Sequence, residues 1–115
     1  HYPVRRPLNV ARLDLTQIGH FSFYTADEKR YPALRLAREV MRRGNLWGAA
    51  FNAAKEVALD RFIGGDIGFL DMAILVEKAL HDMDRAGLLG AEPRDLPDIL
   101  EADQATRERA RTINV

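Results

Sequence analysis

The chain has 115 residues, of which 47% are hydrophobic and 30% charged, a composition typical of one soluble globular domain with its own core. Its 17 basic and 17 acidic side chains balance, so nucleic acid and membrane surfaces, which favour basic proteins, are not expected as partners. The absence of cysteine excludes disulfides, thiolate metal ligands and thiol catalysis, fits a cytoplasmic location, and comes with no apolar run near the roughly 20 residues of a transmembrane helix.

Residues 1–25 are predicted to form an extended linker. Pro3 and Pro7 fix their own φ and disfavour a helical conformation in the residue before them. The segments LDL (13–15) and FSF (21–23) alternate apolar and polar residues on either side of Gly19, so each predicts a three-residue strand. Two prolines and three arginines among the first dozen residues are an unusual start for an independent domain, and we expect this segment to connect it to a longer protein.

Residues 26–115 are predicted to form an all-α domain, a small antiparallel bundle of three or four helices. The first helix is expected over 31–43, with Pro32 in its first turn and Gly44 as its left-handed cap. Leu36 and Val40 belong to its apolar stripe, and its arginines occupy the other side.

Three more helical segments follow. An alanine-rich helix is expected over 47–63, and a third over 72–86 with Asp71 as its N-cap. The proline-bounded stretch 88–97 is predicted to be a loop. The last helical region runs from Asp98 to about Thr112, with a break expected at Asp103.

A polar stripe of Asn52, Glu56 and Asp60, spaced four residues apart, runs along the alanine-rich helix. Two carboxylates one turn apart suit acid–base or metal chemistry, but Lys55 adjoins them and the helix has no histidine. The remaining interpretations are a solvated face or a docking site. An amide donates and accepts hydrogen bonds together, so Asn52 and Glu56 are the predicted docking residues, for the linker or a neighbouring helix end.

No other pattern predicts a reaction site. His1, His20 and His81 are scattered, which disfavours a metal site, and the GGDIG turn (64–68) lacks the spacing of a phosphate loop. The arginine row of the first helix is interpreted as a solvated face. Neither a Ser/His/Asp arrangement nor a cysteine is available, so no catalytic, metal or cofactor-binding residue is predicted.

The alanine-rich segment also carries a resemblance that extends along the whole chain. Residues 52–58, NAAKEVA, resemble the Leu-Asn-Ala-Ala-Asn-Glu-Val-Ala signature of the 1-deoxy-D-xylulose 5-phosphate reductoisomerase family, with Lys55 in place of the second Asn. Five further segments resemble that family's C-terminal region in the same order: HYPVRR (1–6), LDL (13–15) with Phe23, RYPALRLA (30–37), GFLDMA (68–73) and ADQATR (102–107).

The resemblance implies a C-terminal helical domain of an enzyme that uses NADPH and Mg²⁺ or Mn²⁺ to convert 1-deoxy-D-xylulose 5-phosphate into 2-C-methyl-D-erythritol 4-phosphate. In such an enzyme, a homodimer, the cofactor, metal and catalytic residues belong to the domains that precede this one. The chain alone is therefore expected to be inactive and to have those domains as its partners. The alternative is a free-standing helical adaptor without catalytic function.

Overall fold

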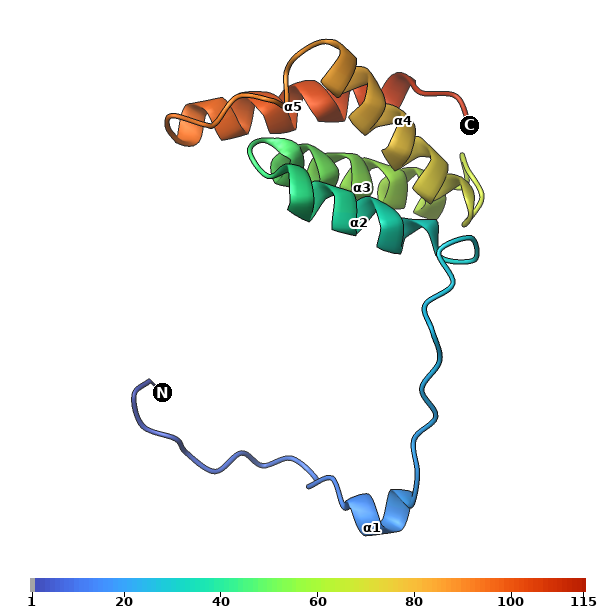
Figure 1. The fold of residues 1–115 in the computed structure, drawn as a ribbon, viewed down its shortest axis with the longest axis vertical. Coiled ribbons are helices and arrows are strands. Elements are labelled where there is room, and N and C mark those ends of the chain that lie inside the picture. The colour runs from blue at the N-terminus through green and yellow to red at the C-terminus, as the bar shows by residue number, and fades with distance from the viewer. Residues whose placement is uncertain (1) are drawn as a thin grey trace.

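The computed structural model describes residues 2–115, which form helices and no strand. The helices are α1 (Leu15–Ile18), α2 (Pro32–Arg43), α3 (Trp47–Ile63), α4 (Asp71–Arg85) and α5 (Leu96–Thr112). The prediction of an all-α bundle is confirmed, with α2 to α5 as its helices (Figure 1).

The two predicted strand pieces are wrong. Leu15, expected to end the first strand, begins α1 instead, and residues 21–23 have no regular structure. A strand needs a hydrogen-bonded neighbour, and neither piece has one among residues 2–115. At the first piece, the carboxylate of Asp14 accepts a 2.9 Å hydrogen bond from the backbone N–H of Thr16, and this cap favours the helical turn.

The bounds of α2 and α3 agree closely with the prediction, whereas α4 and α5 start earlier. Asp71 is the first residue of α4, and its carboxylate accepts a 2.8 Å hydrogen bond from the N–H of Gly68. The start of α5 moves forward to Leu96 because Asp95 caps it, accepting a hydrogen bond from the N–H of Asp98. The predicted break at Asp103 is absent, and α5 is continuous.

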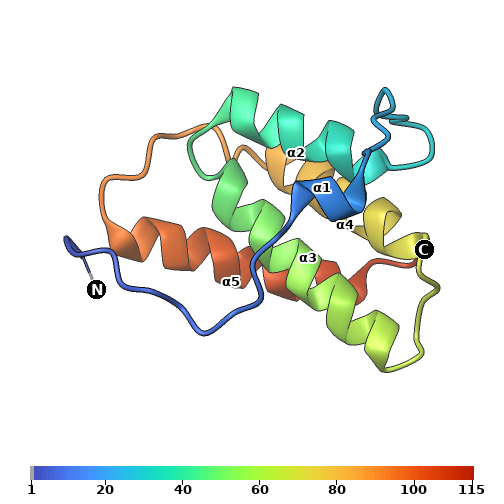
Figure 2. The same ribbon diagram turned by 90° about the horizontal axis from the view of Figure 1, so that it is seen from below.

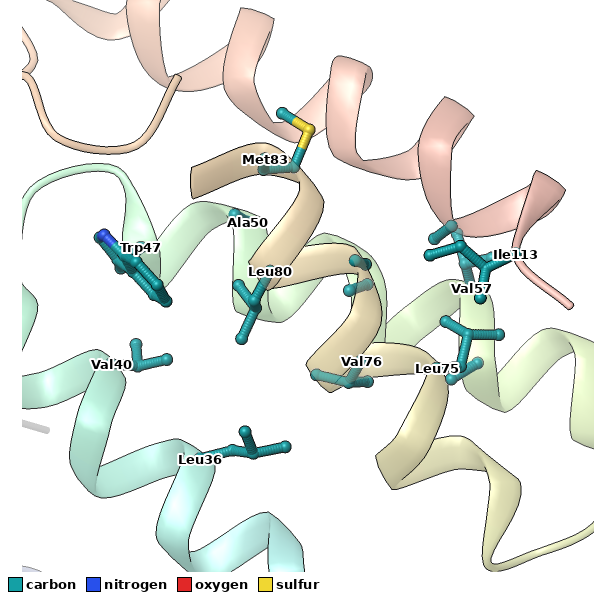
Figure 3. Packing of buried hydrophobic residues seen from close by; sticks show 14 of the residues in the cluster. Leu36, Val40, Trp47, Ala50, Val57, Leu75, Val76, Leu80, Met83 and Ile113 are labelled. Carbon is teal, nitrogen blue, oxygen red and sulfur yellow. The ribbon is translucent and has the colours of Figure 1, made fainter. Parts of the chain in front are cut away.

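Helix α3 is the centre of the bundle and contacts α2, α4 and α5. Its alanines at 50, 53, 54 and 58 are buried, and their small side chains let neighbouring helices come close. Trp47, Val40 and Leu36 point into the space between α2, α3 and α4, while Val57, Leu75 and Ile113 gather where α3, α4 and the end of α5 meet (Figure 3). Burial of these apolar side chains is the main source of stability.

The chain before α2 does not join this core. Residues 2–25, called the arm below, leave the bundle from the start of α2, pass through α1 and end away from the helices (Figures 1 and 2). Every residue of the arm is exposed. The division into residues 1–25 and 26–115 stays a prediction, and His1 lies outside the described residues.

Candidate docking surfaces

The predicted docking residues Asn52 and Glu56 lie on the exposed surface of α3. The side-chain N–H of Asn52 donates a 3.0 Å hydrogen bond to Oε1 of Glu56, one turn along the same helix. The expectation of a buried amide is therefore wrong: Asn52 is exposed, and its bond stays within its helix because residues four apart are neighbours. Its docking role toward another domain stays a prediction.

Glu56 connects α3 to a second helix. Its Oε2 accepts a 2.7 Å hydrogen bond from Arg107 of α5, and the Nε of Arg107 donates to Asp103 at 2.6 Å. The bond from Arg107, followed by the bond from Asn52, lowers the pKa of Glu56. In the same way, its bonds to Asp103 and Glu56 raise the pKa of Arg107. The predicted stripe thus joins two helices through a charged network of Asn52, Glu56, Arg107 and Asp103.

The other residues considered from the sequence do not converge on a reaction centre. Among residues 2–115 there is no group of three or more His, Asp or Glu side chains that could hold a metal ion. In the GGDIG turn the N–H of Gly65 donates to the carbonyl of Phe62, and that of Gly68 donates to Asp71. These donors are already used within the chain, so the turn does not offer them to a phosphate. Within the described residues, no helix is long and apolar enough to cross a membrane.

The arm presents large apolar side chains to solvent. Phe23 and Tyr24 are both 89% exposed. Nine other large apolar side chains on the arm are exposed as well: Tyr2, Val4, Leu8, Val10, Leu13, Leu15, Ile18, Phe21 and the neighbouring Tyr31 close to α2. A segment with so many exposed apolar residues, detached from the core of its own chain, is typical of an interaction surface.

A second surface is a groove at the corner of the bundle, with a cavity volume of about 410 Å³. The start of α2, the outer side of α3 and the start of α4 form its walls, and apolar side chains such as Phe51, Leu59 and Phe69 predominate. Lys55 and Arg30 are its charged residues, and no carboxylate lines it. We call it the corner groove. The sequence analysis missed it because its walls come from three separate segments; the adjacent apolar residues Phe69 and Leu70 in a turn were its only signal.

Comparisons with known proteins identify relatives of the whole chain. The family model described as "DXP reductoisomerase C-terminal domain" matches residues 1–109. The 1-deoxy-D-xylulose 5-phosphate reductoisomerase of Cereibacter sphaeroides is 54% identical over 110 residues, and that of Ruegeria pomeroyi is 56% identical over 110 residues. These alignments cover 96% and 95% of this chain and 28% of each relative, so the chain spans about 28% of the length of these relatives.

The solved structure of the 1-deoxy-D-xylulose 5-phosphate reductoisomerase from Zymomonas mobilis in complex with NADPH is similar in fold, with a TM-score of 0.81 at 35% identity. The match covers 96% of this chain and 28% of that chain. Residues from Pro32 onward make up a smaller share of the chain than this, so the structural match extends into the arm. The path of the arm is thus similar to that of a segment within a much longer protein.

Proposed function

We propose that this chain, which belongs to the DXP reductoisomerase C-terminal domain family, supports the catalytic domains of a 1-deoxy-D-xylulose 5-phosphate reductoisomerase. The full-length protein, called the parent enzyme below, would use NADPH and a divalent metal to form 2-C-methyl-D-erythritol 4-phosphate in the non-mevalonate route to isoprenoids. We expect the parent enzyme to be a cytoplasmic homodimer. The family match over residues 1–109 carries this proposal.

The residues of this chain do not fit the two groups that the reaction requires. Within residues 2–115 no acidic or histidine cluster suits Mg²⁺ or Mn²⁺, which prefer several oxygen ligands. The glycine-rich turn connects two helices, α3 and α4, whereas a dinucleotide fingerprint follows a strand and opens a helix. The proposed role of this chain is therefore structural, and the binding of NADPH and metal is assigned to the preceding domains of the parent enzyme.

The arm supports a role in holding the parent enzyme together. Its exposed apolar side chains find no core within this chain, whereas the helices α2 to α5 build one without it. Burying even part of this apolar surface against another domain contributes about 25 cal/mol per Å² before the ordering of the arm is subtracted. We propose that the arm lies along a preceding domain and fixes the helical bundle against it.

An activity assay on three proteins tests this proposal. NADPH oxidation in the presence of 1-deoxy-D-xylulose 5-phosphate and Mn²⁺ is measured for the parent enzyme, for the parent enzyme without this domain, and for the 115-residue chain. We expect turnover by the parent enzyme only, and no binding of NADPH or Mn²⁺ to the chain in calorimetric titration. Turnover or NADPH binding by the chain alone would contradict the proposed role.

The gene itself separates the proposal from its alternative. A dinucleotide fingerprint followed by an acidic metal motif in the reading frame before His1 supports the parent enzyme. An initiator methionine directly before His1 would instead support a free-standing helical adaptor.

A further inference from the structure

The corner groove is an apolar surface that the chain leaves uncovered. Phe69 and Leu70, on its α4 side, are 68% and 72% exposed, and Leu59 of α3 is about half exposed. The ring of Phe69 is held edge-on against the ring of Phe62, with centroids 5.8 Å apart. The groove wall is therefore built from packed side chains and has a defined shape.

The two cations of the groove differ from those around them. All four arginines of α2 form ion pairs with carboxylates, including Arg35 with Glu77 and Arg43 with Asp84. Lys55 and Arg30 form no ion pair within residues 2–115. Arg30 instead lies over the ring of Tyr31, 5.5 Å from its centroid. The groove thus combines apolar walls, two cations without a carboxylate partner, and no acidic side chain.

The position of the groove indicates what covers it. Tyr31 and Pro32, which line the groove, are the residues through which the arm joins α2. The arm leaves the bundle at this point (Figure 1). A domain that lies along the arm therefore comes next to the groove, and the two surfaces are continuous.

We infer that the corner groove receives an apolar segment of a preceding domain of the parent enzyme, and that an Asp or Glu carboxylate on this segment binds Lys55 and Arg30. This inference rests on the proposed function. The apolar walls provide the buried contact area, and the cations fix the register of the segment because a misplaced carboxylate would lose its partner. A charge-assisted hydrogen bond at the edge of an apolar surface is stronger than one in open water.

The chemistry of the groove is testable on the 115-residue chain with 8-anilinonaphthalene-1-sulfonate, a fluorescent probe that joins apolar rings to an anion. We expect Lys55→Glu to weaken saturable binding of the probe about five-fold or more, since an attraction becomes a repulsion. Lys55→Gln should act in the same direction but less strongly. Lys29→Glu is the matched control, because Lys29 is exposed, lies near the groove in sequence and does not line it.

The same titrations on the parent enzyme identify the occupant. The Lys55-dependent probe binding should be absent there, and Lys55→Glu should lower the unfolding midpoint of the parent enzyme while Lys29→Glu does not. If Lys55→Glu leaves binding by the isolated chain unchanged, the assigned groove chemistry is wrong. If the parent enzyme binds the probe as the isolated chain does, the groove is open and the inference fails, although its reductoisomerase activity still supports the proposed function.

A second copy of the chain is the competing occupant. Sedimentation of the isolated chain would then show a dimer that Lys55→Glu dissociates and Lys29→Glu does not, and this result would overturn the inference. Because neither the probe titration nor sedimentation requires catalysis, failure of the groove proposal and failure of the proposed function are distinguishable.

Discussion

Replacement of Leu75 by alanine tests whether the bundle has a closed core that does not need the rest of the parent enzyme. Leu75 of α4 is fully buried and belongs to the cluster that joins α3, α4 and the end of α5 (Figure 3). Leu75→Ala removes three carbon atoms, worth about 2.4 kcal/mol at about 0.8 kcal/mol each. The cavity left behind raises the expected loss of unfolding free energy to about 3–4 kcal/mol.

The assay is thermal or urea unfolding of the 115-residue chain, followed by helical circular dichroism. For a domain of this size a loss of about 3 kcal/mol lowers the unfolding midpoint by roughly 12–24 °C. Ile74→Ala is the control on the same helix, because Ile74 is 45% exposed and should lose only about 1 kcal/mol. Equal small losses for both variants would refute the packing described for α4.

Three further outcomes follow from the same structure. Asn52→Ala should change the unfolding free energy of the isolated chain by no more than about 0.5 kcal/mol, since the amide is exposed; a loss above about 1 kcal/mol would indicate a buried partner. Deleting residues 1–25 should leave the unfolding midpoint of the isolated chain unchanged, whereas a clear decrease would show that the arm packs on the bundle. Hydrogen bonds from the side chain and then the backbone of Arg94 lower the pKa of Asp98 from 3.8 to about 2, so its stabilising contribution is complete above its ordinary pKa and lost as the pH falls through about 2. Asp98→Asn should therefore lower the unfolding midpoint at pH 7 but not near pH 2, and a difference that persists in acid would contradict the role of this carboxylate.

Local signals in the sequence were sufficient for α2 and α3. Pro32 suits a first helical turn, and Gly44 adopts the positive φ of +67° that side chains disfavour, so both ends of α2 are encoded locally. The start of α5 was missed because Pro97 indicated a loop. In the structure Pro97 is the second residue of the helix, where its missing N–H has no acceptor to lose.

The candidate surfaces were less predictable, because they depend on competition between partners and on distant segments. The spacing of Asn52 and Glu56 allows a bond within the helix and a bond to another segment, and the sequence cannot rank the two. The corner groove joins the starts of α2 and α4 to the side of α3, which no periodicity brings together. The strand pieces failed for the same reason, since three alternating residues say nothing about a partner strand.

The claim that the arm attaches this domain to the parent enzyme is tested most directly by amide hydrogen exchange of residues 2–25. In the isolated chain these amides should exchange at the rates of an unstructured peptide, except for weak protection in α1, while the amides of α3 are protected. In the parent enzyme the arm should become protected as well. An arm that exchanges equally fast in both proteins would contradict the account.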